Sequence, residues 1–132
     1  MTLIIPNSID WNLIGLPLNL SNVNYQNVFP TGIEGSCYGF DGEYFQVIDM
    51  ELGKGNWLRF PDIGSTDITG ELVEDLTVDI LQGWNIISGI SNIVDVYEGI
   101  YDSAEILITE TFYGFDGTYV SSCPLQLIIL LS

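Results

Sequence analysis

In this sequence, the side chains that could do chemistry are mainly carboxylates and aromatic rings. The 132 residues include 18 Asp or Glu, two Cys and no His. Without an imidazole, a Ser-His-Asp triad, a Cys-His pair and histidine metal ligation are ruled out, and two cysteines alone do not make a closed zinc site. Two carboxylates suffice for a glycosidase, but among 18 acids a close pair such as Glu43 and Asp49 is expected by chance. The sequence therefore predicts no catalytic residues and no enzyme.

Calcium is the metal for which the chain offers candidate ligands. Asp62 and Asp67 lie in a glycine-containing segment whose backbone carbonyls could complete a shell of hard oxygen ligands. The ordered ligand spacing of an EF-hand is missing, and a solvated turn explains the same residues. We therefore expect no cofactor, and Asp62 and Asp67 are the candidates if calcium binds.

The aromatic residues offer a second kind of chemistry, because exposed aromatic planes stack against sugar rings. Seven of them recur around similar motifs: Trp11, Trp57, Trp84, Tyr38, Tyr44, Tyr113 and Tyr119. Trp11 and Trp84 each begin an apolar segment, so packing in a shared core is the favoured interpretation and a binding platform is the alternative. The tyrosines directly after two turns are expected to be better exposed. With the turn aspartates they form the candidate ligand-binding set: Tyr44, Tyr119, Asp41 and Asp116.

The two cysteines are a candidate disulfide. Cys37 precedes one Phe-Asp-Gly segment and Cys123 follows the other, as would suit antiparallel neighbours. In an oxidising compartment such a bond would close a long loop and stabilise the fold by about 4 kcal/mol in the chain-entropy model. Two buried free thiols are the alternative.

An internal repeat organises the chain. Tyr-Gly-Phe-Asp-Gly-x-Tyr occurs at 38–44 and again 75 residues later at 113–119, and Trp-Asn-Leu/Ile-Ile occurs at 11–14 and 73 residues later at 84–87. The same order in both places predicts two copies of one unit, at 2–74 and 75–132. The second copy is shortened: Ser132 falls opposite Trp57, so nothing corresponds to residues 58–74. We expect both copies to share one β domain spanning 1–132.

The local pattern predicts strands nearly throughout. Segments rich in Ile, Val, Thr, Tyr and Trp alternate with Gly, Asn, Asp and Pro. The expected strands are residues 3–5, 12–18, 44–50, 57–60, 66–72, 76–81, 85–89, 106–113, 118–122 and 126–131. Asp-Gly in each repeated motif predicts a hairpin with a two-residue type I′ loop, and a short helical turn is expected at 22–29 and 93–99. The fold class is all-β: an antiparallel β-sandwich or small barrel built from two copies of one repeat, the second shortened.

Charge and hydropathy limit the partners. The net charge is −16, with Lys54 and Arg59 as the two basic side chains, which argues against nucleic acid and anionic membrane surfaces. The apolar fraction of 47% is too high for disorder. No apolar run reaches the roughly 18 residues that a membrane span needs. The first residues lack a signal peptide's pattern, so we expect any export signal to lie outside this sequence.

Four motifs together resemble a tandem repeat module found in large secreted or surface-anchored bacterial proteins. The matching segments are 11–17, 38–44, 52–60 and 68–70 in the first copy, and 84–91 and 113–119 in the second. The resemblance implies an extracellular or cell-surface β module with no established chemistry. We therefore expect a structural or adhesive part of a bacterial surface protein. The alternative is a module that binds carbohydrate or another surface protein through exposed aromatics.

The end of the second copy departs from the repeat pattern. Residues 126–132 have neither the glycines nor the tryptophan of residues 51–57. The apolar segment from Leu127 to Leu131 is a strand that needs a neighbour. Pairing with another chain, as a homodimer or by strand exchange, is one way to supply it.

Overall fold

The structure is a computed structural model that describes residues 1–73, 83–88, 113–115, 119–121 and 128–131. The elements are β1 (Thr2–Asn7), β2 (Asp10–Ile14), α1 (Tyr25–Val28), β3 (Tyr38–Phe40), β4 (Tyr44–Gln46), β5 (Asn56–Phe60), β6 (Gly64–Thr69), β7 (Asn85–Ser88), β8 (Tyr113–Phe115), β9 (Tyr119–Ser121) and β10 (Ile128–Leu131). The all-β prediction is confirmed. Within the described ranges, no helix is long and apolar enough to cross a membrane.

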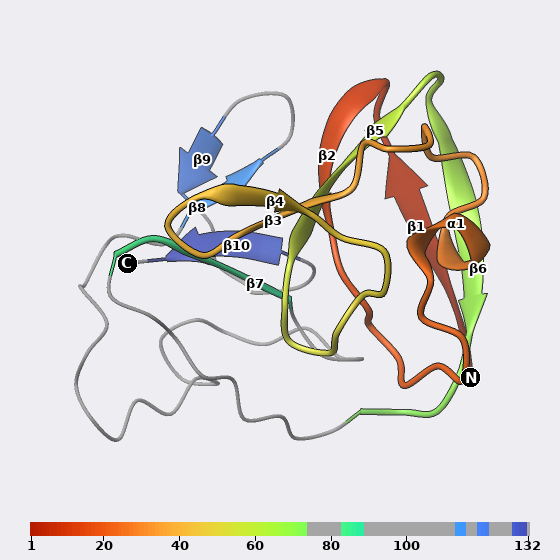
Figure 1. The fold of residues 1–132 in the computed structure, drawn as a ribbon. Helices are drawn as coiled ribbons and strands as arrows, with labels where there is room; N and C mark the ends of the chain where they lie inside the picture. Colours follow the sequence, from red (N-terminus) through yellow and green to blue (C-terminus); the bar gives the residue numbers. More distant parts are fainter. Residues whose placement is uncertain (74–82, 89–112, 116–118, 122–127, 132) are drawn as a thin grey trace.

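The strands form three antiparallel sheets (Figure 1). β1 pairs with β6 in a two-stranded ribbon, while β2-β5-β3-β4 and β7-β10-β8-β9 are four-stranded. In the first four-stranded sheet β5 is central, because it pairs with β2 on one side and with β3 on the other. This sheet therefore holds together segments that are more than 40 residues apart along the chain.

The two four-stranded sheets have the same strand order and the same local register. In the first, Trp57 lies opposite Leu13 and also opposite Tyr38. In the second, Leu130 lies opposite Ile86 and Tyr113. Leu130 therefore corresponds to Trp57 in the strand pairing, whereas the sequence alignment placed Ser132, two residues further on, opposite Trp57. The alignment was wrong at this position because hydrogen-bond register, which it does not contain, determines which residues correspond.

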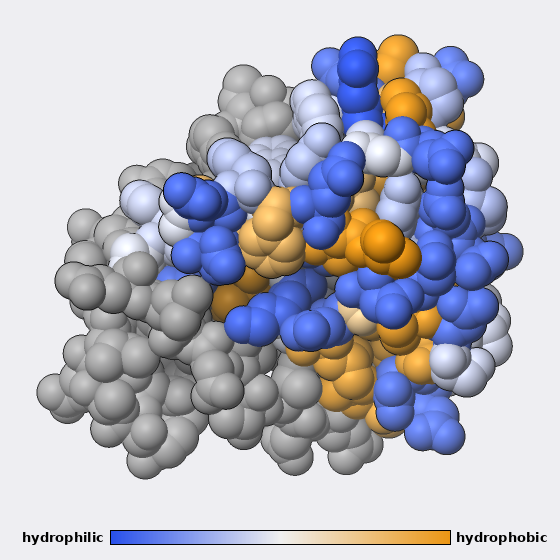
Figure 2. Space-filling model, in the orientation of Figure 1, coloured by the Kyte–Doolittle hydropathy of each residue, from blue (hydrophilic) through white to orange (hydrophobic). Residues whose placement is uncertain are grey.

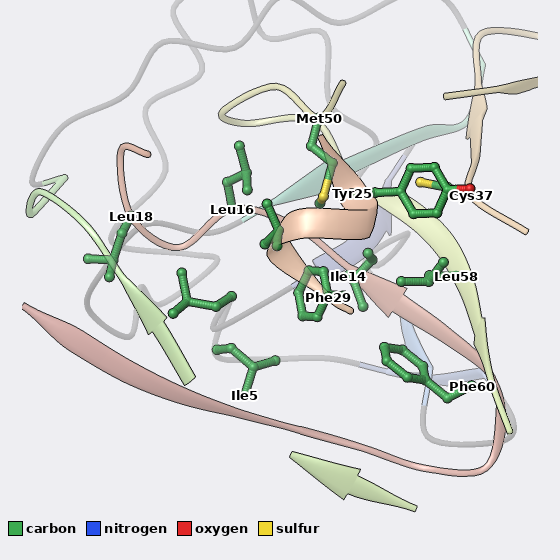
Figure 3. Close-up of a cluster of buried hydrophobic side chains, with 12 residues drawn as sticks. Ile5, Ile14, Leu16, Leu18, Tyr25, Phe29, Cys37, Met50, Leu58 and Phe60 are labelled. Atoms are coloured by element: carbon green, nitrogen blue, oxygen red, sulfur yellow. The ribbon is translucent and has the colours of Figure 1, made fainter. Parts of the chain in front are cut away.

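A hydrophobic core lies beneath one face of the first sheet (Figure 3). Its buried members are Ile5, Ile14, Leu16, Leu18, Tyr25, Val28, Phe29, Cys37, Met50, Leu58, Phe60 and Ile68. The rings of Phe29 and Phe60 meet edge to face, with centroids 6.1 Å apart. α1 covers this core, and its N-cap Asn24 accepts a hydrogen bond from the Gln26 N–H. The helical turn predicted at 22–29 is confirmed, and the one at 93–99 lies outside the described residues.

The first repeated motif forms the predicted hairpin, but the predicted type I′ turn is wrong. Phe40 pairs with Tyr44, so the loop holds three residues instead of two. A type I′ turn needs a positive φ at both central residues, and in this loop only Gly42 has one, at 106°. The Asp41 side chain instead accepts a hydrogen bond from the Glu43 N–H, at 3.4 Å. The hydrogen bond from the Glu43 N–H to the Asp41 side chain therefore stabilises a three-residue loop in place of the two-residue type I′ turn.

Three predicted strands extend past the ends of those in the structure. The strand expected at 12–18 ends at Ile14, the one expected at 44–50 ends at Gln46, and the one expected at 66–72 ends at Thr69. After Ile14 the chain is irregular, and residues 15 to 18 are all buried, so burial does not alternate from one residue to the next. Pro17, which has no N–H, lies in this segment and suits the departure from the ladder. The segment predicted at 76–81 and most of that at 106–113 lie outside the described residues.

Candidate functional site

The strand register gathers aromatic side chains on the face of the first sheet that points away from the main core. Side chains two apart on a strand share a face, as do directly paired residues on neighbouring strands. Trp57 pairs with both Leu13 and Tyr38, which places all three on this face. The same rule adds residues from each strand, so the face comprises Trp11, Leu13, Tyr38, Phe40, Tyr44, Gln46, Trp57 and Arg59.

Four of these residues, Trp11, Tyr38, Tyr44 and Trp57, line an open hollow of about 510 Å³, here called the aromatic hollow. Trp57 is 9% exposed, whereas Trp11 is 38% and Tyr44 is 61% exposed. The Trp11 and Tyr38 rings are 6.3 Å apart and tilted by 57°, and the Phe40 ring supports Tyr44 at 4.9 Å. Trp57 therefore forms a buried base, and the outer rings present surface to solvent. The volume lies within the usual range for ligand sites.

The favoured core interpretation was wrong for two of the tryptophans. Trp11 and Trp84 are exposed at 38% and 44%, although Trp57 is buried as expected. Trp11 is on β2, an edge strand of its sheet, and Trp84 precedes β7 at the edge of the other sheet. A ring at a sheet edge has fewer neighbours to cover it. Strand order decides this exposure, and the sequence motif around each tryptophan does not contain that information.

The structure places the predicted ligand-binding residues only in part. Tyr44 lines the aromatic hollow, and Asp41 is exposed in the adjoining loop. Tyr119 lies in β9, and Asp116 lies outside the described residues. Trp11, Tyr38 and Trp57, which join Tyr44 in the hollow, belong to the aromatic set for which a binding platform was the alternative interpretation. Trp11 and Tyr38 lie outside the predicted strands, and the strand order that brings the four rings together was not visible in the sequence.

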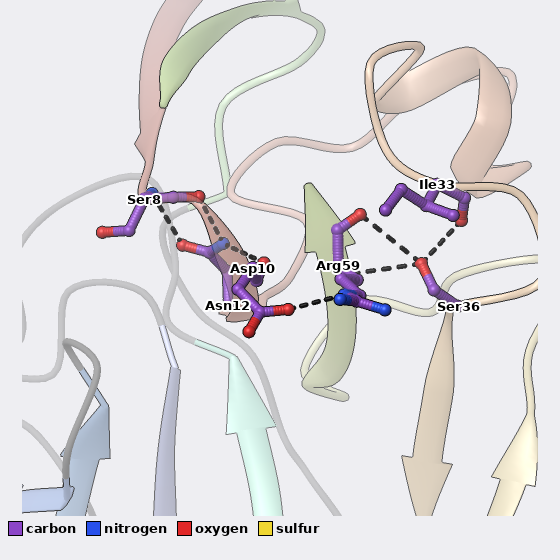
Figure 4. Close-up of polar contacts among 6 residues, drawn as sticks. All are labelled: Ser8, Asp10, Asn12, Ile33, Ser36 and Arg59. Carbon is purple, nitrogen blue, oxygen red and sulfur yellow. Dashed lines mark hydrogen bonds and ion pairs between the residues drawn. The ribbon is translucent and has the colours of Figure 1, made fainter. Parts of the chain in front are cut away.

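Polar side chains lie near the Trp11 end of the hollow, and Figure 4 draws the contacts among them. Arg59 is the cross-strand partner of Trp11, and its Nε donates to Asp10 Oδ1 at 2.5 Å. Asp10 has a positive φ of 74°, and the Asn12 side chain holds this turn by donating to the Asp10 carbonyl. The Ser36 hydroxyl accepts from the Arg59 N–H at 3.1 Å. Both side chains of the ion pair are exposed, but the backbone of Asp10 and of Arg59 is held by these hydrogen bonds.

A second polar group borders Tyr38. Gln46, its cross-strand partner, lies with its Nε2 3.5 Å from the Tyr38 hydroxyl and donates to the Gly35 carbonyl. The hollow therefore has an apolar interior and hydrogen-bonding groups at its border. This combination is typical of a site for a ligand that carries both ring faces and hydroxyls.

A smaller cavity of about 160 Å³ lies between the first sheet and β7. Its wall includes Phe45, Asp49, Asn56 and Ile86. The Oδ1 of Asn56 is buried without a hydrogen-bond partner. This volume is below that of ordinary ligand sites, and we assign it no ligand.

The calcium candidates do not form a cluster with a third ligand. Asp62 lies in the loop before β6, where its carbonyl accepts from Asn7 Nδ2 at 2.9 Å, and Asp67 lies within β6 opposite Ile4. Among the residues that the structure describes, no group of three or more His, Cys, Asp or Glu side chains could hold a metal ion.

Cys37 is a free thiol buried in the main core, and Cys123 lies outside the described residues. Burial raises the pKa of the Cys37 thiol from 9.0 to about 12, because the thiolate loses its hydration. A thiol of this kind is a poor nucleophile at neutral pH. The disulfide with Cys123 stays a prediction.

β10, the described part of the segment from Leu127 to Leu131, pairs within its own chain. β7 lies on one side of it and β8 on the other. Both edges of this strand are therefore occupied, and pairing with a second chain is not needed to satisfy it. The homodimer and the strand exchange stay untested.

Comparisons with protein-family models, with curated proteins and with solved structures find no match for this chain. The resemblance to the bacterial repeat module therefore stays a prediction. Inferences about function depend on the geometry of the aromatic hollow.

Proposed function

We propose that this chain is a non-catalytic carbohydrate-binding module of an extracellular or cell-surface bacterial protein. The observation that carries the proposal is the aromatic hollow, in which Trp11, Tyr38 and Tyr44 surround the buried Trp57. Flat aromatic rings with polar tips offer both an apolar face and a hydrogen bond, and a pyranose ring presents the same two features to them.

The chemistry of the surface favours a sugar over the other partners considered. A chain with 18 acidic and two basic side chains repels polyanions, so we propose no nucleic-acid partner. Figure 2 shows hydrophobic side chains interspersed with hydrophilic ones on the viewed face, without one continuous apolar surface. A protein partner ordinarily requires a broader interface than the four rings of the hollow.

We further propose that the two four-stranded sheets are the two copies of the repeat, arranged as the halves of a β-sandwich. Their identical strand order and matching registers support this assignment. Contact between the sheets also supports it, since Ile86 of β7 packs with Leu13 and Trp57 of the first sheet. In this arrangement the second copy stabilises the sheet that carries the hollow.

A structural or adhesive spacer is the second candidate, and the repeated sheet order favours it. Modules built from repeats often serve as extended supports in larger proteins. A spacer requires no exposed aromatic site, whereas this chain has one. We therefore rank the binding function first and expect a pure spacer to retain its fold while binding no glycan.

The proposal is tested by isothermal titration calorimetry against neutral oligosaccharides. We expect Trp11→Ala and Tyr44→Ala each to weaken binding by at least about tenfold, or about 1.4 kcal/mol, because aromatic side chains dominate such contacts. Trp84→Ala is the matched control, since it removes a similarly exposed tryptophan outside the hollow. Binding that survives both hollow variants, or that Trp84→Ala weakens as much, would show that this site is not responsible.

A further inference from the structure

Resting on the proposed carbohydrate function, we infer that the aromatic hollow binds an uncharged, extended glycan along the length of the sugar chain, with the Arg59–Asp10 ion pair contacting its hydroxyls. Four observations carry this inference. They are the diagonal arrangement of the rings, the exposure of the end rings, the charge around the hollow and the position of the ion pair.

The rings form a diagonal row across the whole sheet. Trp11 is on edge strand β2, Trp57 and Tyr38 lie one side-chain row further along on the central strands, and Tyr44 lies one row beyond on edge strand β4. With strands about 4.8 Å apart and about 3.3 Å per residue, the row extends about 14 Å across the strands and about 13 Å along them. A single sugar ring does not fill such a row, but an extended oligosaccharide does.

The described residues close neither end of the row. Trp11 and Tyr44, the end rings, are the most exposed of the four, and Trp57 in the middle is the least. A site that recognises a chain terminus needs a wall that stops the chain. An open row instead accepts an internal segment, and its affinity rises with the number of sugar units that contact rings.

The charge around the hollow excludes anionic glycans. Asp41 and Glu43 lie in the loop next to Tyr44, and Asp10 lies beside Trp11 at the other end. The guanidinium of Arg59 is already paired with Asp10, so it offers no uncompensated positive charge to a uronate or sulfate. The Tyr44 end of the row therefore repels an acidic sugar chain, and the Trp11 end offers it no net positive charge.

The ion pair is placed to recognise hydroxyls. Arg59 is directly opposite Trp11 on the same face, and its guanidinium keeps N–H donors beyond the one given to Asp10. A sugar stacked on Trp11 would present hydroxyls at the level of this pair, where Arg59 donates and Asp10 accepts. Charge-assisted hydrogen bonds of this kind fix the orientation of a ligand that the aromatic rings alone would allow to slide.

The test compares ligands by length and charge. Titrations use neutral β-1,4-linked hexasaccharides of glucose, mannose and xylose, their disaccharides, and an oligogalacturonate of equal length, followed by tryptophan fluorescence. We expect at least one neutral hexasaccharide to bind about tenfold or more tightly than its disaccharide, and the uronate not to bind. Equal affinity for the disaccharide, or binding of the uronate, overturns this inference and leaves the carbohydrate function standing. If none of the sugars binds, the proposed function fails as well.

The role of the ion pair is tested with two substitutions that each remove one positive charge. Arg59→Ala should weaken binding of the preferred neutral hexasaccharide about fivefold or more. Lys54→Ala removes the second basic side chain, which does not line the hollow, and should leave binding unchanged. Thermal unfolding of both variants checks that the fold is intact. If wild type and folded Arg59→Ala bind with equal affinity, the ion pair does not contribute to glycan binding.

Discussion

Among single residues, the proposed glycan binding depends on which rings are buried and which are exposed. Trp57 is covered because Leu13 and Ile86 pack against it, and Trp11, on an edge strand, has fewer neighbours. The exposure of Tyr44 was predictable, since the residue directly follows a turn. That of Trp11 was not, because the apolar residues after it are equally consistent with a strand buried on both faces.

The buried thiol gives a prediction about pH. Burial raises the pKa of Cys37 to about 12, whereas the thiol of the unfolded chain ionises near 9.0. Between these values the folded protein keeps a proton that the unfolded chain loses, so the free energy of unfolding falls as pH rises from about 9 to about 12. Below about pH 9 the thiol is protonated in both states, so this group adds no pH dependence there.

This effect is isolated by comparing wild type with Cys37→Ala. Urea unfolding at pH 8 and pH 10.5 should show a smaller loss of stability for Cys37→Ala than for wild type, by up to about 1.4 kcal/mol per pH unit. Every other residue is the same in both proteins, so only the difference between them is interpreted. Identical pH dependence in the two proteins would mean that the thiol is not buried in the folded state.

At the scale of elements, the strands were easier to predict than their partners. Local alternation and Asp-Gly turns predicted most of the described strands and the first hairpin. The pairing of β1 with β6 joins residues more than 55 apart, and no local pattern contains it. The position of α1 over the core and the buried Leu16 and Leu18 depend on the same non-local packing.

A pair of glycines at the two ends of β6 tests this packing. A Cβ at Gly70 would lie 2.6 Å from the Asn19 carbonyl oxygen, next to the mutual backbone hydrogen bonds of Asn19 and Glu71. Because a backbone atom cannot move aside cheaply, Gly70→Ala should destabilise the protein by about 1 to 3 kcal/mol.

Gly64→Ala is the control for this substitution. A Cβ at Gly64 would meet nothing closer than 3.6 Å, so thermal or urea unfolding should find this variant within about 0.5 kcal/mol of wild type. If the two variants are equally stable, the contact between residues 19 and 71 is not made as described.

At the scale of the whole molecule, the internal repeat connects the sequence to the sheet arrangement. The repeated motifs occupy corresponding strands of two sheets with one strand order, and β10 completes the second sheet although its sequence has lost the pattern. The position of β10 in the sheet is set by its register and not by its residue types. The order of the elements could therefore be predicted from the sequence better than the site, which is made of side chains from all four strands of one sheet.

The pairing of β10 predicts the state of the protein in solution. Since both edges of this strand are occupied within the chain, we expect light scattering at micromolar concentration to give the mass of one chain, 14.6 kDa. A stable dimer that is lost when Leu130 is replaced by Pro, in a variant that remains folded, would instead indicate strand exchange through this segment.

Glycan binding in the aromatic hollow is best checked by an NMR titration. The three tryptophan indole N–H signals are followed while a neutral hexasaccharide is added. We expect the largest shifts for Trp11 and Trp57, which line the hollow, and little change for Trp84, which does not. Shifts confined to Trp84, or no shift of any indole at saturating sugar, would contradict it.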